Sequence, residues 1–324
     1  MTANEKHRLA ILASAVLLGT SSAGAQTYPA KTVRMVVPFA AGGGVDVVGR
    51  LLAPKLTDAW KQQIVVENRA GGGSVIGTEV VARSAPDGYT LLLTAPPFTT
   101  NAALHPKLPY DSLQDFAPVT LVAVAPLIVV LHPSLPVRSI KDLVAVAKAR
   151  PGQLSYGSSG NGGPQHLAGE LFKSMAGVDL VHIPYKGAAP ATVDLVGGQV
   201  QIGFSNMLTV LTFVKSGRLR PIAVTSAQRT AVIPELPTIA ESGFPGYETT
   251  SWYGILVRAG TPPAVIATLN ADMARALKLP EIRDRLATEG ATVVASSPTA
   301  FAAFLQAEIE RVRKLSTFTV IKLD

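Results

Sequence analysis

The sequence predicts an α/β protein with two lobes, each built on a largely parallel sheet that carries helices on its faces. Short β-branched runs alternate with longer stretches of helical periodicity, and this alternation produces parallel strands joined by crossover helices. The chain has 324 residues, enough for two domains of ordinary size. A final strand-and-helix region follows the second lobe, so we expect the first lobe to be assembled from both ends of the chain.

The predicted first lobe opens with three strands separated by two helices. The run Val33–Val37 is apolar and β-branched, and it ends at Pro38, which cannot donate to a strand ladder. Apolar residues then recur at helical spacing from Val45 to Leu56. The turn Pro86-Asp87-Gly88 precedes the third strand, because proline fixes φ and glycine accepts a positive φ. The expected elements are strands at 33–37, 64–68 and 89–94 and helices at 45–60 and 74–83.

The second lobe is expected to begin near Pro118 and to repeat this alternation. Pro126 interrupts its first strand, and a glycine-rich loop follows Leu154-Ser155-Tyr156. Strands are expected at 119–131, 180–184, 200–204 and 219–225, and helices at 140–150, 165–176, 188–197 and 207–216.

The last third of the chain is expected to return to the first lobe. Its first helix follows the pair Pro262-Pro263, and proline is favoured at the first helical position. The expected elements are strands at 252–257 and near 293–294 and helices at 263–278, 281–288 and 298–315. We therefore predict a first lobe of residues 26–124 with 226–324, a second lobe of residues 125–225, and a ligand cleft between them.

The N-terminus has the pattern of a secretory signal peptide. Lys6 and Arg8 precede an apolar run from Leu9 to Leu18, and the box Ala23-Gly24-Ala25 follows it. A disordered tail or a membrane anchor is the alternative, but a spanning helix needs about 20 apolar residues and this run has roughly half that. We expect residues 1–25 to be cleaved, a mature chain from Gln26 in the periplasm, and no membrane insertion.

Composition excludes several kinds of site. The chain has no cysteine, so disulfides, thiolate metal sites and a cysteine nucleophile are absent. The formal charge is +7, and the basic residues are dispersed rather than interleaved with aromatic side chains. Nucleic-acid binding is therefore not expected, whereas a mild positive field suits an anionic solute.

The first candidate site is the glycine-rich loop that joins the strand 33–37 to the next helix. Its sequence, from Phe39 and Ala40 through Gly42 and Gly43 to Asp46, lets the backbone approach an anion at a helix N-terminus. It is neither a G-x-G-x-x-G fingerprint nor a P-loop, because the required third glycine and the Lys-Ser/Thr pair are missing. Asp46 has two interpretations, a helix cap or an acceptor for a ligand hydroxyl or amine.

The second candidate loop has the same placement in the other lobe. Ser158, Gly160 and Asn161 follow a strand, and His166 begins the next helix. Two such loops facing across a cleft would hold the two ends of a diacid. A G-x-S-x-G nucleophile elbow is absent from the sequence, which removes the main signature of a serine hydrolase.

Further candidates follow other strands. His166 is expected to hydrogen-bond loop backbone, since the other histidines lie in separate segments and no H-E-x-x-H motif occurs. Lys186 either neutralises an anion or is simply solvated. The run 94–98 is expected to form a cleft wall. Side chains at strand ends commonly face ligands, which adds Thr94, Tyr185, Ser205 and Asn206 to the expected site.

A series of short motifs links the chain to a known family through their order and spacing. They are Pro38-Phe39-x-x-Gly42-Gly43 with Asp46, Glu67-Asn68-Arg69, Ala85-Pro86-Asp87-Gly88-Tyr89, Tyr156-Gly157-Ser158-Ser159-Gly160, His166-Leu167-Ala168, Pro184-Tyr185-Lys186-Gly187, Pro237-Thr238, Glu241-x-Gly243 and Ser251-Trp252-Tyr253-Gly254. With these motifs the chain resembles the Bug-type periplasmic solute-binding receptors of tripartite tricarboxylate transporters.

The resemblance implies a type II, Venus-flytrap binding-protein fold and a small carboxylate ligand. In such receptors the loops that match 38–46 and 157–166 hold a ligand carboxylate, partly through ordered water. It also implies transient contact with membrane transporter subunits, no cofactor, no metal and no enzymatic activity, and we expect a monomer. A sensor that docks to a signalling partner and an exported hydrolase are the alternatives.

Overall fold

The structure is a computed structural model that describes residues 28–288 and 290–317. The chain divides into two units, Met1–Ala30 and Lys31–Asp324, and the description below concerns the second. The predicted signal peptide lies outside the described residues. Within those residues, no helix combines the length and the apolar character that a bilayer-spanning segment requires.

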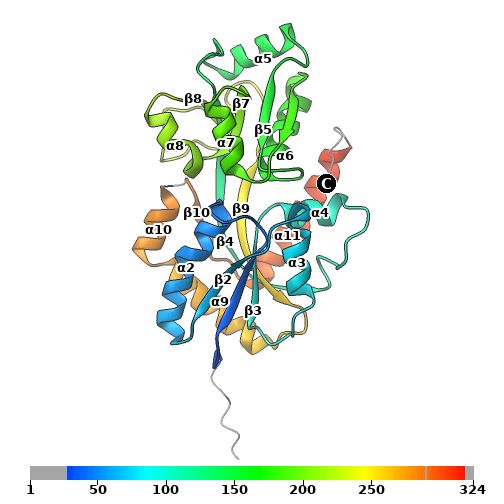
Figure 1. The fold of residues 1–324 in the computed structure, drawn as a ribbon, viewed down its shortest axis with the longest axis vertical. Helices are drawn as coiled ribbons and strands as arrows, with labels where there is room; N and C mark the ends of the chain where they lie inside the picture. The colour runs from blue at the N-terminus through cyan, green and yellow to red at the C-terminus, as the bar shows by residue number, and fades with distance from the viewer. Residues whose placement is uncertain (1–27, 289, 318–324) are drawn as a thin grey trace, which may run out of the picture. The chain divides into compact units, whose positions relative to one another are not determined.

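The first half of the fold is a sheet whose parallel strands are joined by helices (Figure 1). Strand β1 pairs in parallel with β2 and β3, and β9 then pairs antiparallel with both β3 and β4. The parallel strands and their connections are β1 (Val33–Val37), α2 (Gly44–Trp60), β2 (Ile64–Asn68), the 3₁₀ turn η1 (Gly72–Ser74), α3 (Val75–Ala82), β3 (Thr90–Thr94) and α4 (Pro97–Leu104).

The second half is a sheet of the same kind. Strand β5 pairs in parallel with β6 and β7, while β7 and β8 pair antiparallel with β4. Its elements are α5 (Ile140–Ala149), β5 (Ser155–Ser158), α6 (Pro164–Ala176), β6 (Val181–Pro184), α7 (Ala188–Val196), β7 (Ile202–Asn206), α8 (Met207–Lys215) and β8 (Arg220–Val224).

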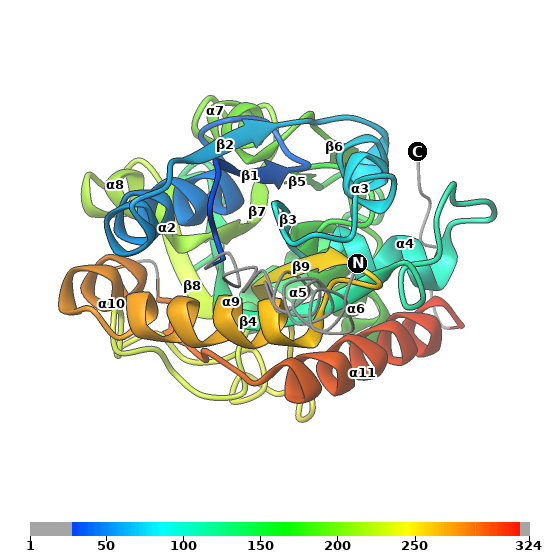
Figure 2. The same cartoon turned by 90° about the horizontal axis from the view of Figure 1, so that it is seen from below.

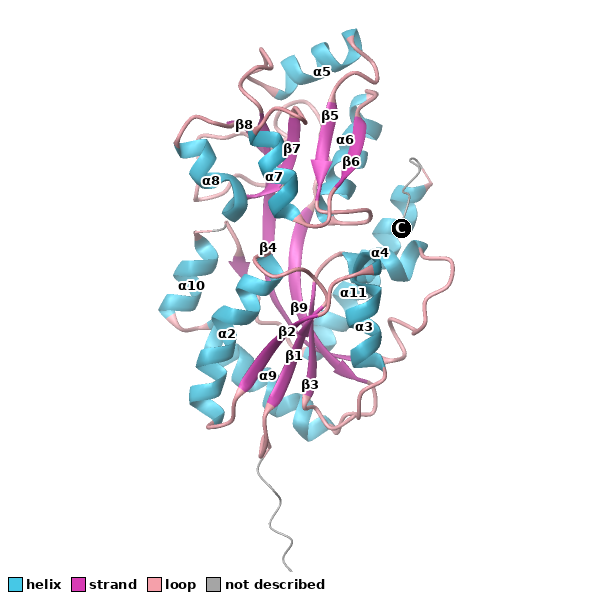
Figure 3. Ribbon diagram, viewed as in Figure 1, coloured by secondary structure: helices cyan, strands magenta, loops and turns pink. Residues whose placement is uncertain are grey.

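One long strand, β4 (Phe116–Leu131), belongs to both sheets (Figure 3). Its residues up to Pro126 pair with β9, and those from Leu127 onward pair with β7 and β8. Proline lacks the N–H group that a central strand position would need, so Pro126 suits the point where the ladder changes partner. The interruption expected at Pro126 is thus a change of partner within a continuous strand.

The C-terminal third returns to the first sheet, as expected. Strand β9 inserts between β3 and β4, and β10 pairs with β4. Figure 2 shows α9, α10 and α11 gathered on one side of β4 and β9. These elements are β9 (Thr250–Arg258), α9 (Pro263–Leu277), α10 (Pro280–Ala287), β10 (Thr292–Val293) and α11 (Pro298–Ser316). The exact lobe boundaries stay a prediction.

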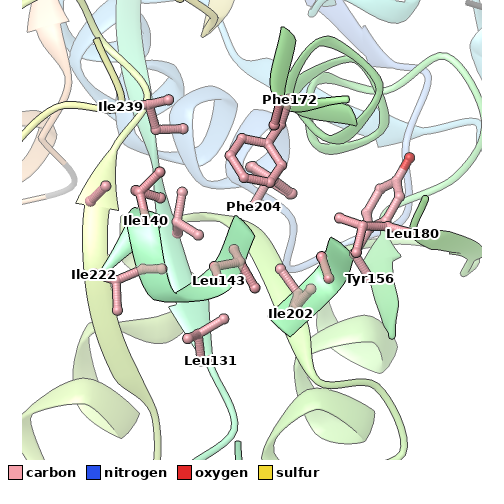
Figure 4. Close-up of a cluster of buried hydrophobic side chains, with 14 of the residues drawn as sticks. Leu131, Ile140, Leu143, Tyr156, Phe172, Leu180, Ile202, Phe204, Ile222 and Ile239 are labelled. Atoms are coloured by element: carbon pink, nitrogen blue, oxygen red, sulfur yellow. The ribbon is translucent and has the colours of Figure 1, made fainter. Parts of the chain in front are cut away.

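Each sheet has its own apolar core. In the first, Trp252 of β9 packs edge-on against Phe301 and Phe304 of α11. In the second, Tyr156, Phe172 and Phe204 pack with aliphatic residues (Figure 4). Each buried aromatic or aliphatic side chain contributes about 1.5–3 kcal/mol, so both halves are stabilised without disulfides.

Candidate functional site

A pocket of about 630 Å³ lies where strands of both sheets end. Its walls come from the segments that follow β1, β2 and β3 and from those that follow β5 and β6, with one residue from β7 and two from β9. Ligand pockets commonly measure 300–1,000 Å³ and lie beyond the carboxyl ends of parallel strands. Both predicted glycine-rich loops border this pocket.

The first loop presents the start of helix α2 to the pocket. Gly42 has φ +82°, a value that favours glycine, and Gly43 is the N-cap in an extended conformation. No side chain in the described part of the chain caps this end of the helix. The first-turn N–H groups therefore keep their capacity to bind an anion. Phe39, Ala40 and Gly43 line the pocket.

The buried side chain of Asp46 holds this loop through hydrogen bonds. Its carboxylate accepts hydrogen bonds from the Gly42 N–H at 2.9 Å, the Asn68 side-chain amide at 3.0 Å and Arg50 Nε at 2.9 Å. Burial alone would raise the pKa of Asp46, but these hydrogen bonds and the Arg50 charge leave that pKa below its usual value. The side chain is 4% exposed. Its polar partners are therefore all groups of the protein itself.

We expect Asp46→Ala to weaken the binding of every carboxylate by a similar factor, because the contacts of Asp46 are to the loop. Losing three buried hydrogen bonds lets the loop move, which corresponds to roughly a tenfold rise in Kd. Titration with malate and with unhydroxylated succinate measures this directly. A selective loss of malate affinity would instead assign Asp46 to a ligand hydroxyl.

The second loop repeats the arrangement of the first. Gly160 and Gly162 have φ values of +132° and +70°, and Gly163 is an extended N-cap for α6. Again, no side chain of the described residues caps the helix. Gly160, Asn161 and Gly163 line the pocket together with the first loop. The two helix starts therefore open on one space, as the sequence analysis anticipated.

Two histidines lie behind the second loop. The His166 and His182 rings are stacked with centroids 3.9 Å apart and an interplanar angle of 6°. His166 Nδ1 accepts a hydrogen bond from the Gly162 N–H at 3.0 Å, and His182 Nε2 lies 2.6 Å from the Ser158 hydroxyl oxygen. The expectation that His166 bonds loop backbone is confirmed. The expectation that the other histidines are unconnected with it is wrong for His182.

Burial, with the neighbouring His166 as a second cause, lowers the pKa of His182 to about 3. An unfolded chain binds this proton near its ordinary value of 6.5, so between pH 6.5 and pH 3 the unfolded state binds more protons than the folded state. The contribution of the neutral His182 to the free energy of unfolding is therefore fully present above pH 6.5. It is lost progressively as the pH falls from 6.5 towards 3.

We expect the free energy of unfolding of the wild type to fall by roughly 1–2 kcal/mol more than that of His182→Gln between pH 7.0 and pH 4.5. Urea unfolding at both pH values measures the difference. Because carboxylate titration affects both proteins equally, the variant isolates the histidine. Parallel losses in the two proteins would show that His182 is not responsible.

The remaining predicted residues fall into different surroundings. Tyr185 and Asn206 line the pocket, and Ser158, Ser205 and Asn206 line a small adjoining cavity. Thr94 is fully buried, and its neighbours Ala95 and Pro97 form the pocket wall in its place. The exposed Gly42 and the buried Asp46 and His166 are not among the lining residues.

Two buried polar atoms at or beside the site lack an internal partner. Among residues 28–288 and 290–317, neither the Asn206 side-chain oxygen nor the Thr94 hydroxyl has a hydrogen-bond partner. Buried polar groups are normally satisfied. The Asn206 oxygen, at the pocket, is therefore able to accept a bond from water or from a ligand hydroxyl.

Sequence reasoning missed several lining residues. Gly71-Gly72-Gly73-Ser74 follows β2 in the same way that the other loops follow their strands, and it lines the pocket. Tyr253 and Ser251 come from β9, which reaches the site only because it inserts between β3 and β4. The repeated strand–glycine–helix pattern could have identified the first group. No local signal identifies the second.

The charge of the pocket is modest and positive. Among its described lining residues, Lys186 is the one with a charged side chain, and it is exposed. Two uncapped helix N-termini add the equivalent of about half a positive charge each. The described ranges contain no group of three side chains that could hold a metal ion. The site is built to attract an anion.

Comparison with known proteins agrees with this geometry. The family model described as "Tripartite tricarboxylate transporter family receptor" matches residues 48–318. Protein BugT of Bordetella pertussis is 42% identical over 289 residues, which cover 89% of this chain and 89% of that protein.

Solved structures resemble the chain over most of its length. The R. palustris protein Rpa4515, solved with adipate, has 38% identity and a TM-score of 0.86, covering 90% of this chain and 98% of its own. MatC from Rhodopseudomonas palustris, solved with bound malate, has 31% identity and a TM-score of 0.83, covering 89% and 99%. The periplasmic binding protein BugD has 35% identity and a TM-score of 0.85, covering 91% and 99%.

These matches confirm the expected fold class, a two-lobed periplasmic binding protein. They also confirm the resemblance drawn from the short motifs. The chain belongs to the receptor family of the tripartite tricarboxylate transporters, the Bug-type solute-binding receptors.

Proposed function

We propose that this chain is an exported receptor that binds a small dicarboxylate in the pocket and delivers it to a tripartite tricarboxylate transporter. The observation that carries the proposal is the pair of uncapped helix starts, α2 and α6, which border one pocket from different sheets. Two solved relatives hold adipate and malate, and both of these ligands are dicarboxylates.

To bind a dicarboxylate, the pocket must replace the water molecules that hydrate each carboxylate. A carboxylate withdrawn from water without hydrogen bonds loses several kcal/mol, so each end of the ligand needs several donors. Backbone N–H groups at a helix start supply them in a fixed direction, and the helix dipole favours negative charge there. This arrangement needs no arginine, and the lining residues that the structure describes include none.

Part of the pocket wall is apolar and suits an uncharged ligand backbone. The lining includes Phe39, Pro97 and Pro190, and the one charged lining side chain among the described residues is Lys186. A linear diacid with a short carbon chain therefore fits these walls.

Export of the chain and delivery of its ligand are supported by different observations. The pattern Lys6, Arg8, Leu9–Leu18 and Ala23-Gly24-Ala25 supports secretion to the periplasm. Membership of a transporter receptor family supports transfer of the ligand to membrane subunits. Co-purification with a signalling protein rather than with transporter subunits would favour the sensor alternative.

The contact between Ser158 and His182 is the one observation that favours catalysis, because a serine hydroxyl beside an imidazole is the arrangement of an activated nucleophile. The Ser158 side chain, however, belongs to a residue that is only 1% exposed. A histidine whose pKa is lowered to about 3 is also a poor general base at neutral pH. We therefore propose binding without turnover.

Calorimetric titration tests the proposal. Adipate and malate should bind with micromolar or tighter Kd, and ligand at a hundred times Kd should stabilise the protein by about 2.7 kcal/mol. The matched control is adipamide, which has the same chain length without charge and should bind at least a hundredfold more weakly. Equal binding of adipamide, or no binding across mono-, di- and tricarboxylates, would overturn the ligand class.

A further inference from the structure

The second loop has few internal constraints of its own. Gly160 and Gly162 both have positive φ, and glycine loses more conformational freedom on folding than any other residue. Within the loop, Ser158 and Gly163 bond to Gly160, and the Ser159 hydroxyl donates to the Gln165 side chain at 2.7 Å. From outside, the Tyr185 and Gly187 N–H groups donate to the Ser158 and Ser159 carbonyl oxygens. A loop of this kind needs contacts from outside to present its N–H groups in one direction.

The stacked histidines contact the loop at two separate points. His182 lies against the Ser158 hydroxyl, which also accepts from the Gly160 N–H at 3.2 Å. His166 accepts from the Gly162 N–H at 3.0 Å. One ring therefore holds the beginning of the loop and the other holds its end. Neither histidine is among the described residues that line the pocket.

The stack itself is fixed from its other side. The Tyr156 ring stacks on His182 with centroids 5.0 Å apart, and Gly169 of α6 leaves room for the Tyr156 ring. The Tyr156 hydroxyl donates to Glu170 at 2.8 Å, and Lys173 donates to the same carboxylate oxygen at 2.8 Å. The ring order His166–His182–Tyr156 thus connects the loop to a partly buried ion pair on α6.

The proton positions follow from these contacts. Since the Gly162 N–H points at His166 Nδ1, that nitrogen must be unprotonated, and the His166 proton sits on Nε2. Protonation of both rings would remove this acceptor and place two like charges 3.9 Å apart. The titratable and charged groups facing His182 are Tyr156 of β5 and His166, Glu170 and Lys173 of α6.

We propose that His166 and His182 act together as neutral positioning residues that hold the second loop in its anion-binding conformation. They act through Gly162 and Ser158 and do not touch the ligand. The inference rests on the proposed carboxylate site, but the loop conformation can be measured without ligand.

The test uses substitutions that keep or remove the polar atom of each ring. Asparagine places its side-chain oxygen near the position of imidazole Nδ1, and glutamine reaches the position of Nε2. The informative pairs are His166→Asn against His166→Leu and His182→Gln against His182→Leu. Circular dichroism and urea unfolding establish that each variant is folded.

Two measurements are made at pH 7.5, the Kd for adipate and the hydrogen-exchange rate of the Gly162 amide without ligand. We expect the leucine variants to raise Kd by about tenfold or more and to speed exchange by a similar factor. The asparagine and glutamine variants should stay within about threefold of the wild type. Leucine variants that are less stable but keep wild-type Kd and exchange would overturn the proposal.

The two readouts separate this inference from the proposed function. If the wild type binds no carboxylate, the proposed function fails, and the exchange rates still decide the positioning role. If the wild type binds adipate and the leucine and polar variants lose affinity equally, the rings are needed for packing alone, and the positioning role is wrong.

Discussion

Replacing Ala40 by glutamate is expected to weaken dicarboxylate binding by about a hundredfold while leaving the fold unchanged. Ala40 is exposed on the first loop and lines the pocket, so a longer side chain can be accommodated. Two like charges about 6 Å apart at an effective dielectric constant of 20 repel by roughly 3 kcal/mol. The new carboxylate would also compete for the first-turn N–H groups of α2.

The matched control is Ala40→Gln, which has the same shape without the charge. Calorimetric titration with adipate should give a Kd within about threefold of the wild type for the glutamine variant, since it lacks the repulsion. Increasing salt should narrow the gap between the two variants, because an exposed charge is screened. Equal affinity in the glutamate and glutamine variants would mean that the ligand anion lies away from the first loop.

Replacing Gly44 by alanine is expected to lower both stability and ligand affinity. Gly44 begins α2, and a Cβ there would lie 2.6 Å from the Tyr253 hydroxyl oxygen. The backbone of Gly44 is compatible with alanine, so this collision is the main effect. Overpacking of this kind typically costs about 1–3 kcal/mol, and relief requires the helix start or Tyr253 to move within the pocket.

The double variant Gly44→Ala/Tyr253→Phe distinguishes the collision between the new Cβ and the Tyr253 hydroxyl from other effects of the alanine substitution. Removing the hydroxyl leaves the ring Cζ atom as the nearest neighbour at 3.4 Å, an ordinary contact distance. Urea unfolding across the four proteins of the cycle should show that most of the lost stability returns. An alanine variant as stable and as tight-binding as the wild type would show that the helix start is not packed against Tyr253.

The parallel strands and the helices that follow them could be predicted because each leaves its pattern in a short stretch of the sequence. Each parallel strand is a short apolar run followed by glycines and a periodic helix, as from Val33 to α2 and from Ser155 to α6. The two glycine-rich loops that border the pocket could be predicted in this way. Helix α4 was not among the expected elements, because the run 94–98 was considered only as a cleft wall; proline is well tolerated in the first turn of a helix.

The contacts that complete the site depend on strand order and register. His182 meets His166 because β6 pairs with β5, which places His182 beside Tyr156 and under the start of α6. Tyr253 reaches Gly44 because β9 enters the first sheet antiparallel. Neither relation leaves a periodic or compositional trace in the sequence.

The proposed function requires that a dicarboxylate is held between the N-termini of α2 and α6. The crystal structure of the protein with adipate tests it most directly. We expect one carboxylate to lie about 3 Å from backbone nitrogens within residues 43–46, and the other at the same distance from the N–H nitrogen of Gly163, Gln165 or His166, directly or through one ordered water. Adipate held against Lys186 alone, or with both carboxylates away from the two helix starts, would contradict the account.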